Sequence, residues 1–197
     1  VANINPSPTS SSTGTGGSIN SLGNRVGLFD TTLDASGTNG GGTIRIGGDY
    51  QGQGSIPNAD YTYVSPSSRI RADALLSGDG GRVILWANDT TRFYGNISAR
   101  GGPLTGNGGF VEVSGKQSLI FRGLVDTTAP NGNFGTLLLD PIDITILDGS
   151  SDGNDPGSLT NAFGSNITGD SGQVFGGDAI PTVIYESELE GLSAGTN

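Results

Sequence analysis

The chain has 197 residues, of which 36 are glycine, and its formal net charge is −10, with 9 Lys and Arg against 19 Asp and Glu. That charge argues against a nucleic-acid partner and against attraction to anionic lipid, and no apolar run is long enough for direct membrane insertion as a helix. Cysteine and histidine are both absent, which excludes a disulfide framework, a thiolate or imidazole metal site and a Ser-His-Asp triad.

The amino-terminal part is a polar segment followed by alternating strands. Residues 1–16 are rich in Ser, Thr, Pro and Gly, and we expect them to form a polar edge segment. Further on, Gly42 is followed two and four residues later by Ile44 and Ile46. The next glycine of this kind, Gly81, comes 39 residues after it. Residues 47–66 are therefore expected to protrude as a loop insertion at one edge of the fold.

One unit is repeated along the central part of the chain. Gly81, Gly109 and Gly135 mark the same point in successive copies, 28 and 26 residues apart. The residues two and four positions after each glycine are apolar and are expected to point inward: Val83, Leu85, Val111, Val113, Leu137 and Leu139. Alternation with period 2 indicates strands, and self-similarity at this spacing indicates a solenoid. Residues 17–146 are therefore predicted to form an all-β stack of parallel strands, with Phe93 and Phe121 stacked inside it.

The carboxy-terminal part departs from the repeat. Residues 147–178 are an Asp-, Gly- and Ser-rich excursion, and residues 179–197 are expected to form a strand and a short helical turn that begin a further coil of a longer protein. Asp148, Ser150 and Asp152 resemble the first half of a calcium loop, but Leu159 stands where such a loop needs Glu. Calcium is thus a weak cofactor candidate, and a solvated loop is the favoured interpretation.

Several stretches resemble a known family. They are GGTIRIGGDYQG, GDGGRVILWANDTTRFYGNISARGG, GNGGFVEVSGK and GTLLLDPIDITI. They are similar to the large filamentous-haemagglutinin-like exoproteins of the two-partner secretion pathway in Gram-negative bacteria, cyanobacteria included. The resemblance covers residues 17–146 and resumes over residues 185–197. It implies a right-handed parallel β-helix, export through a dedicated outer-membrane pore, an extracellular or cell-surface location, and a role in adhesion or surface structure.

Outward positions supply the candidate contact surface. Ile84 and Leu138 are expected in one outer row on either side of Glu112, where exposed apolar side chains need a cover or a partner. Leu189 and Leu192 would cover part of one end. The residues considered for stacking on a sugar ring are Trp86, Tyr50, Tyr61, Tyr63 and Tyr94, and the formal glycosylation acceptors are Asn88, Asn96 and Asn166.

This pattern leaves three functions open: a non-enzymatic structural or adhesive segment, a self-assembling fibre subunit that contacts identical copies, and a polysaccharide-cleaving enzyme. Acid–base chemistry would need carboxylates such as Glu112, Asp126, Asp140 and Asp143. No charged cluster recurs in register, and a turn-shaping role is favoured for these acids. The leading hypothesis is the adhesive segment, with a cell-surface or glycan receptor as partner and with no catalytic residue assigned.

Overall fold

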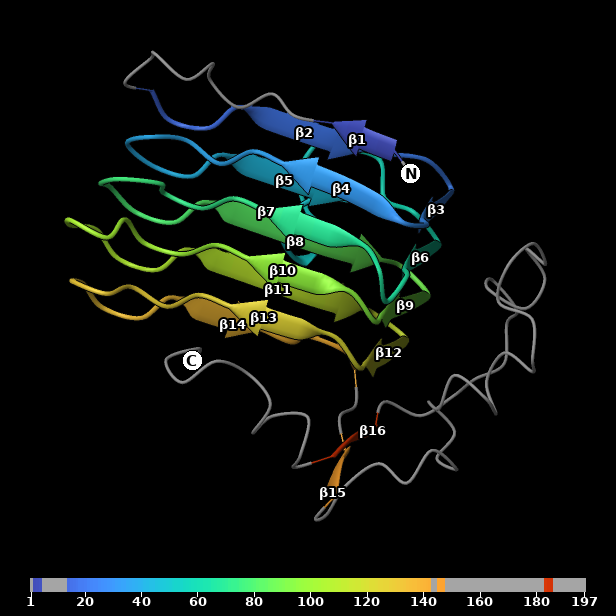
Figure 1. The fold of residues 1–197 in the computed structure, drawn as a ribbon. Coiled ribbons are helices and arrows are strands. Elements are labelled where there is room, and N and C mark those ends of the chain that lie inside the picture. The colour runs from blue at the N-terminus through green and yellow to red at the C-terminus, as the bar shows by residue number, and fades with distance from the viewer. Residues whose placement is uncertain (1, 5–13, 143–144, 148–182, 186–197) are drawn as a thin grey trace.

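The computed structural model describes residues 2–4, 14–142, 145–147 and 183–185 of the chain. Its strands form a parallel β-helix in which four complete coils each contribute one strand to three sheets (Figure 1). Sheet A contains β1 (Ala2–Ile4), β4 (Thr31–Asp34), β7 (Arg69–Arg71), β10 (Asn96–Ser98) and β13 (Leu124–Asp126). Sheet B contains β2 (Ser18–Ser21), β5 (Thr43–Ile46), β8 (Arg82–Ala87), β11 (Phe110–Gly115) and β14 (Thr136–Leu138). Sheet C contains β3 (Arg25–Leu28), β6 (Tyr61–Val64), β9 (Thr90–Phe93) and β12 (Ser118–Phe121).

The predicted register of the repeat is confirmed residue by residue. In sheet B, Val111 lies opposite Val83 on one side and opposite Leu137 on the other, so the spacings of 28 and 26 residues are those of the coils. In sheet C, Phe93 lies opposite Phe121, and their ring centroids are 5.4 Å apart. Each coil therefore places side chains of the same kind directly above those of the next coil.

The core is the column of inward side chains enclosed by the three sheets. Val83, Leu85, Val111 and Val113 are fully buried, as the alternation predicts. Leu137 and Leu139 are only partly buried, although both pack against the core. On the facing side, sheet A contributes an inward column of its own, made of Leu33, Ile70, Ile97 and Val125. The apolar fraction of the chain suffices because each strand needs only one short inward stripe.

Glycine marks the corner where each coil passes from sheet A to sheet B. There the glycine N–H donates to a carbonyl from the end of the sheet A strand: Gly42 to Ala35, Gly81 to Ala72, Gly109 to Ala99 and Gly135 to Thr127, at 2.7–2.8 Å. The backbone is so crowded here that a Cβ added at Gly109 would lie 2.1 Å from the carbonyl oxygen of Gly81. No side chain fits this corner, which explains why the glycine recurs in each copy.

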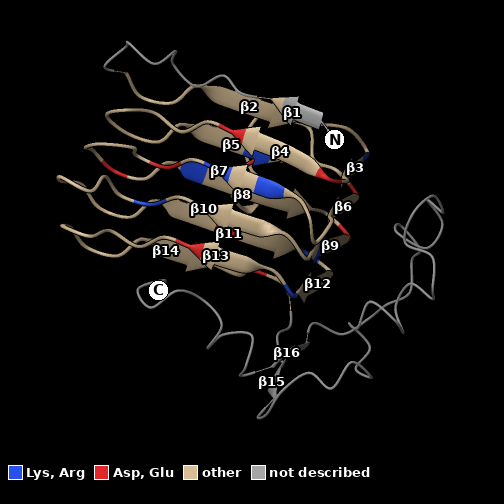
Figure 2. Cartoon of the chain, in the orientation of Figure 1, with Lys and Arg blue, Asp and Glu red and all other residues tan. Residues whose placement is uncertain are grey.

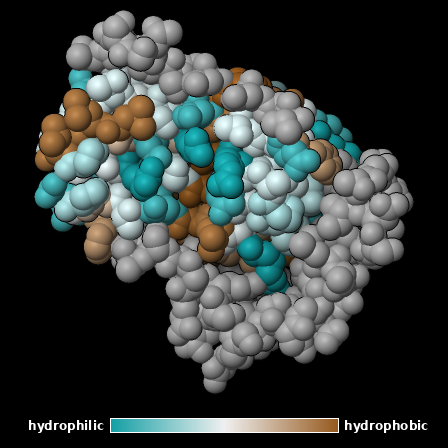
Figure 3. Space-filling model, in the orientation of Figure 1, coloured by the Kyte–Doolittle hydropathy of each residue, from teal (hydrophilic) through white to brown (hydrophobic). Residues whose placement is uncertain are grey.

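The residues between these bonded positions project as loops, 36–41, 73–80, 100–108 and 128–134, which we call the arm loops (Figure 1, left). They stack on one another through their own hydrogen bonds, for example from Leu104 N–H to the Leu76 carbonyl at 3.0 Å. Leu75, Leu76 and Leu104 are 59, 46 and 65% exposed. Figure 3 shows a hydrophobic patch on the side where the arm loops project. The charges are sparse, and Figure 2 shows the two ends of β7 in blue on the front face.

Three predicted boundaries are wrong in detail. Residues 2–4, assigned to the polar edge segment, form β1 and pair with β4. Residues 61–64, assigned to the insertion, form β6 and stack in register on β9, so the insertion ends at residue 60. The stack ends before residue 146, because β15 (Thr145–Leu147) pairs with β16 (Val183–Tyr185) in a separate sheet. In the described ranges no helix is long and apolar enough to cross a membrane, the single helical turn being η1 (Tyr50–Gly52).

Candidate functional site

The insertion, residues 47–60, folds back over the outer face of sheet B. The turn η1 lies against β8, and there Ile84 is fully buried and Trp86 is 4% exposed. Contact is so close that a Cβ added at Gly52 would lie 2.5 Å from the indole ring of Trp86. The prediction that Ile84 and Trp86 form an exposed contact surface is therefore wrong, because the chain's own insertion covers that row. Leu138, in the same row, is half-buried.

Glu112 anchors this cover. It lies between Ile84 and Leu138 in the outer row, as predicted, and it is fully buried. The N–H of Gln51 donates to both of its carboxylate oxygens, at 3.1 and 3.2 Å. Burial raises the pKa of Glu112, and the nearby Asp140 adds to this, while the Gln51 hydrogen bond and Arg82 act in the opposite direction. A carboxylate enclosed in this way cannot reach a substrate outside the fold.

A second anchor holds the start of the turn. Asp49 accepts a hydrogen bond from the N–H of Tyr50 at 2.8 Å and pairs with Arg45 Nε at 3.0 Å. Burial raises the pKa of Asp49, but the Tyr50 hydrogen bond and the charge of Arg45 outweigh it, so the pKa lies below its ordinary value. The start of the turn is thus tied to β5 through Arg45, and its middle residue, Gln51, is tied to β11 of another coil through Glu112.

Replacement of Glu112 by glutamine is expected to stabilise the fold at neutral pH and to lose this advantage in acid. Because the pKa of Glu112 is raised above its ordinary value of 4.5, the folded chain binds that proton more tightly than the unfolded chain does. The ionised side chain therefore lowers the free energy of unfolding at pH values above the pKa that Glu112 has in the unfolded chain. As the pH falls through the pKa of Glu112 in the folded chain, the stability of wild type rises relative to that of Glu112→Gln. Urea unfolding of both proteins at about pH 7 and about pH 4 measures this difference. A wild type more stable than the variant at neutral pH would contradict it.

The aromatic residues of the insertion and of sheet C have partners in the fold. The ring of Tyr50 meets Phe110 at 5.7 Å, and the Arg82 guanidinium lies 4.9 Å from Tyr50 and 5.0 Å from Phe110. Tyr61 donates to Asp89 at 2.9 Å. Tyr63 and Tyr94 are buried, and burial raises the pKa of Tyr63 to about 12. The proposed set of sugar-stacking rings is therefore not an open surface: only Tyr50, 37% exposed, has much solvent contact.

At the edge of the insertion an open hollow of about 370 Å³ lies beside Trp86 and Asn88, with Lys116 and Asp140 on its other side. Asn88 is exposed and accepts a hydrogen bond from the Trp86 indole N–H at 3.3 Å. Asn96, the other described acceptor, is half-buried within β10. Their glycosylation stays a prediction. Asp148, Ser150, Asp152, Asn166, Leu189, Leu192 and Asp143 lie outside the described residues.

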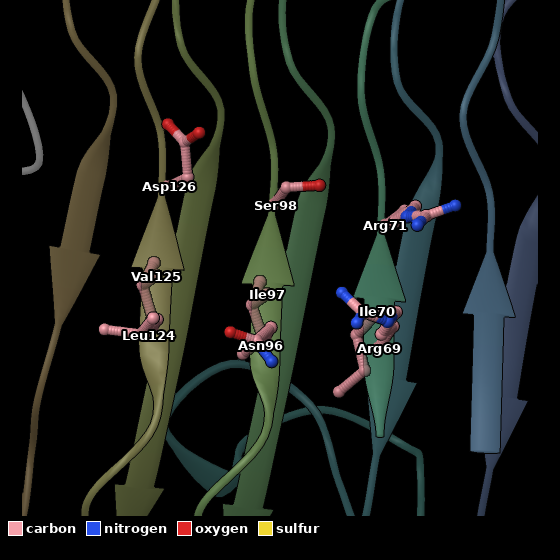
Figure 4. Close-up of a pocket in the computed structure, with 9 residues that line it drawn as sticks. All are labelled: Arg69, Ile70, Arg71, Asn96, Ile97, Ser98, Leu124, Val125 and Asp126. Atoms are coloured by element: carbon pink, nitrogen blue, oxygen red, sulfur yellow. The ribbon is translucent and has the colours of Figure 1, made fainter. Parts of the chain in front are cut away.

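On its outer face sheet A carries a groove of about 330 Å³, and no other described segment covers it (Figure 4). Its side chains form two rows across neighbouring strands: Arg69, Asn96 and Leu124 in one, and Arg71, Ser98 and Asp126 in the other. Figure 4 shows the two arginines on one side, Leu124 and Asp126 on the other, and the shorter Asn96 and Ser98 between them. The groove exists because Asn96 and Ser98 on β10 are shorter than the arginines of β7, while Leu124 and Asp126 border it from β13.

The charges around this groove are unequally satisfied. Arg100, which follows β10, donates to Asp73 at 2.9 Å, and this hydrogen bond raises the pKa of Arg100. Arg71 reaches Asp34 only at 3.9 Å, and both groups are partly exposed, so this ion pair is weak. The side chain of Arg69 has no ion pair or hydrogen bond to another residue within the described part of the chain. The groove thus has one arginine that is free to bind a ligand and a second that is loosely held.

The acids proposed for catalysis do not meet in this groove. Asp126 accepts hydrogen bonds from the N–H and the hydroxyl of Thr128, at 3.0 and 2.7 Å, which is the turn-shaping role favoured for it. Glu112 lies on a different sheet, beneath the insertion. Within the described ranges no group of three acidic side chains is placed to hold a metal ion.

The sequence pattern did not reveal the groove, although it placed Phe93 and Phe121 at matching points of successive coils. The residues on either side of Ile70, Ile97 and Val125 are the groove residues. Reading these flanking positions across the three aligned coils would have shown two arginines, two short polar side chains, a leucine and an acid in adjoining rows.

The fold and its surface define a β-solenoid with one covered face and one open, grooved face. No known family model matches the chain, and no curated protein matches it.

Proposed function

We propose that this chain is a non-enzymatic, structural and adhesive segment of a large secreted protein of the bacterial cell surface. The observation that carries the proposal is the groove of sheet A, where, among the described residues, the side chain of Arg69 makes no contact that holds the coils together and Arg71 is held only by a weak ion pair. The repeat motifs support the same proposal through their resemblance to filamentous-haemagglutinin-like exoproteins. In this proposal the chain passes through an outer-membrane pore during export, and the groove meets a receptor on a surface outside the cell.

Two contacts argue against an enzyme. Glu112, whose pKa is raised, is enclosed by the backbone of Gln51, and Asp126 is held by Thr128. Glycoside hydrolysis requires two carboxylates that both reach the scissile bond, and the enclosed Glu112 cannot supply one of them. The described polar side chains of sheet A bind neighbouring coils or face the groove.

Adhesion and turnover can be measured on the same protein. Beads coated with the purified chain are expected to attach to cell surfaces and to insoluble cell-wall material, while soluble polysaccharides incubated with the chain release no new reducing ends. Beads coated with a heat-unfolded sample serve as the control for unspecific attachment. Polysaccharide cleavage that disappears in Asp126→Asn or Glu112→Gln would overturn the proposal, as would beads that attach no better than the control.

A self-assembling fibre subunit is the second candidate, and one observation favours it. Leu75, Leu76 and Leu104 are exposed together at the arm loops, and exposed apolar patches commonly mark association surfaces (Figure 3). Electron microscopy of the purified chain separates the two candidates, since isolated rods fit the adhesive segment and long polymers fit the fibre.

A further inference from the structure

We propose that the groove of sheet A binds an anionic polysaccharide whose sugar rings carry carboxylate groups. This inference rests on the proposed adhesive function and names the ligand class of the same groove. It starts from the charge of the groove, which differs from that of the whole chain. The chain has a net charge of −10, yet Arg69 and Arg71 stand side by side on one strand and only Arg71 has an acidic neighbour, at 3.9 Å.

The form of these cations selects the anion. A guanidinium presents a planar fork of N–H donors that matches a carboxylate in a bidentate way. Residues two apart on a strand lie on the same face about 6–7 Å apart. Both guanidinium groups therefore lie on the outer face of sheet A beside the groove, and that of Arg71, which leans toward Asp34 of β4, is held there only by a 3.9 Å contact. A ligand with repeated carboxylates can engage both arginines at once.

The rest of the groove suits sugar hydroxyls. Asn96 and Ser98 form its floor, and Asn96 offers both donors and an acceptor (Figure 4). The Ser98 hydroxyl donates to Asp73 at 3.0 Å and can still accept, and Asp126 adds an acceptor at the far side. Leu124 is 50% exposed and provides an apolar surface for the face of a ring. The volume of about 330 Å³ falls at the lower end of the range for small-ligand sites.

The sheet itself disfavours an acidic peptide as the ligand. Extended peptides gain affinity by adding a strand to an exposed sheet edge through backbone hydrogen bonds. Strand β10 is an interior strand of sheet A, paired with β7 on one side and β13 on the other, so near the groove a peptide strand could add only beyond β13, at the border of the groove and not over its floor. Recognition over this face must therefore come from side chains, and the side chains present match carboxylates and hydroxyls.

Binding of the whole chain to polygalacturonate tests the inference, with three comparison polymers: the methyl-esterified form of the same polymer, a sulfated polysaccharide and polyglutamate. We expect polygalacturonate to bind more tightly than all three comparison polymers, and we expect its binding to weaken as salt is added. Arg69→Gln is expected to weaken the binding of polygalacturonate about tenfold or more. Arg69→Lys is expected to bind it more tightly than Arg69→Gln but more weakly than wild type. Lys116→Gln is the matched control, since it removes the same charge from an exposed site on another part of the surface.

The outcomes separate this inference from the proposed function. If coated beads attach to cell surfaces but Arg69→Gln binds polygalacturonate as wild type does, the ligand class is wrong and the adhesive role stands. If the sulfated polymer or polyglutamate bound more tightly, the inference of a carboxylated polysaccharide would be wrong and that polymer would represent the ligand class instead. Equal losses in Arg69→Gln and Lys116→Gln would mean unspecific charge attraction and would likewise overturn it. If the beads fail to attach as well, the proposed function fails with it.

Discussion

Alanine at Gly109 is expected to destabilise the β-helix by about 3 kcal/mol, near the upper end for an overpacked buried site. The added Cβ would lie 2.1 Å from the carbonyl oxygen of Gly81 and 2.7 Å from the carbonyl carbon of Gly80. Both are backbone atoms of the coil before, so no flexible side chain can move aside. That same oxygen of Gly81 accepts the N–H of Phe110 at 3.0 Å, so relief of the clash would break the first bond between β8 and β11.

Gly23 provides the matched control for this substitution. A Cβ added there meets nothing closer than 3.7 Å, and its backbone does not require a positive φ. Gly23→Ala is therefore expected to be neutral or to stabilise by about 0.4–1 kcal/mol through the unfolded chain. Urea unfolding followed by circular dichroism gives the stability of both variants. If Gly109→Ala and Gly23→Ala were equally stable, the backbone around Gly109 would have room for a Cβ, contrary to this prediction.

Spacing in the sequence was enough to predict the register of the stack. The corner admits only glycine, and the inward positions of sheets A and B hold apolar side chains, so both recur from coil to coil and both can be recognised in the sequence. This is why the partners Val83 and Val111, or Phe93 and Phe121, follow from counting residues. The limits of the insertion were harder to predict, because β6 begins without a glycine and its outward Tyr61 and Tyr63 are typical of a loop as well as of a strand.

The two faces of the solenoid could not be predicted in the same way. Whether Ile84 and Trp86 are exposed depends on a contact between Gln51 and Glu112, which are 61 residues apart, and Gln51 lies in an insertion that does not repeat. The groove depends on relative side-chain length on neighbouring coils, with Asn96 shorter than Arg69 and Ser98 shorter than both Arg71 and Asp126. A repeat fixes where a side chain points, but its cover and its neighbours are set by residues that do not repeat.

Proline at Gln51 is expected to detach the insertion while the coils stay folded. Gln51 has φ 52°, and proline holds φ near −65°, so the turn cannot form as it does in wild type. Proline also lacks the N–H that donates to both oxygens of Glu112, which leaves a buried carboxylate without that donor. The Glu112 carboxylate is then more stable when hydrated than when buried. Together, the two effects are expected to destabilise the attached state of the insertion by more than about 3 kcal/mol.

The single tryptophan of the chain reports this change directly. Trp86 is 4% exposed beneath the insertion, so detachment should shift its emission to the red and increase quenching by acrylamide, while far-ultraviolet circular dichroism stays that of the β-helix. Gln51→Gly is the control, because glycine keeps the N–H and adopts positive φ without strain, so its emission should match that of wild type. If Gln51→Pro left Trp86 as protected as in wild type, or if Gln51→Gly exposed it equally, the backbone of Gln51 would not be what holds the insertion over sheet B.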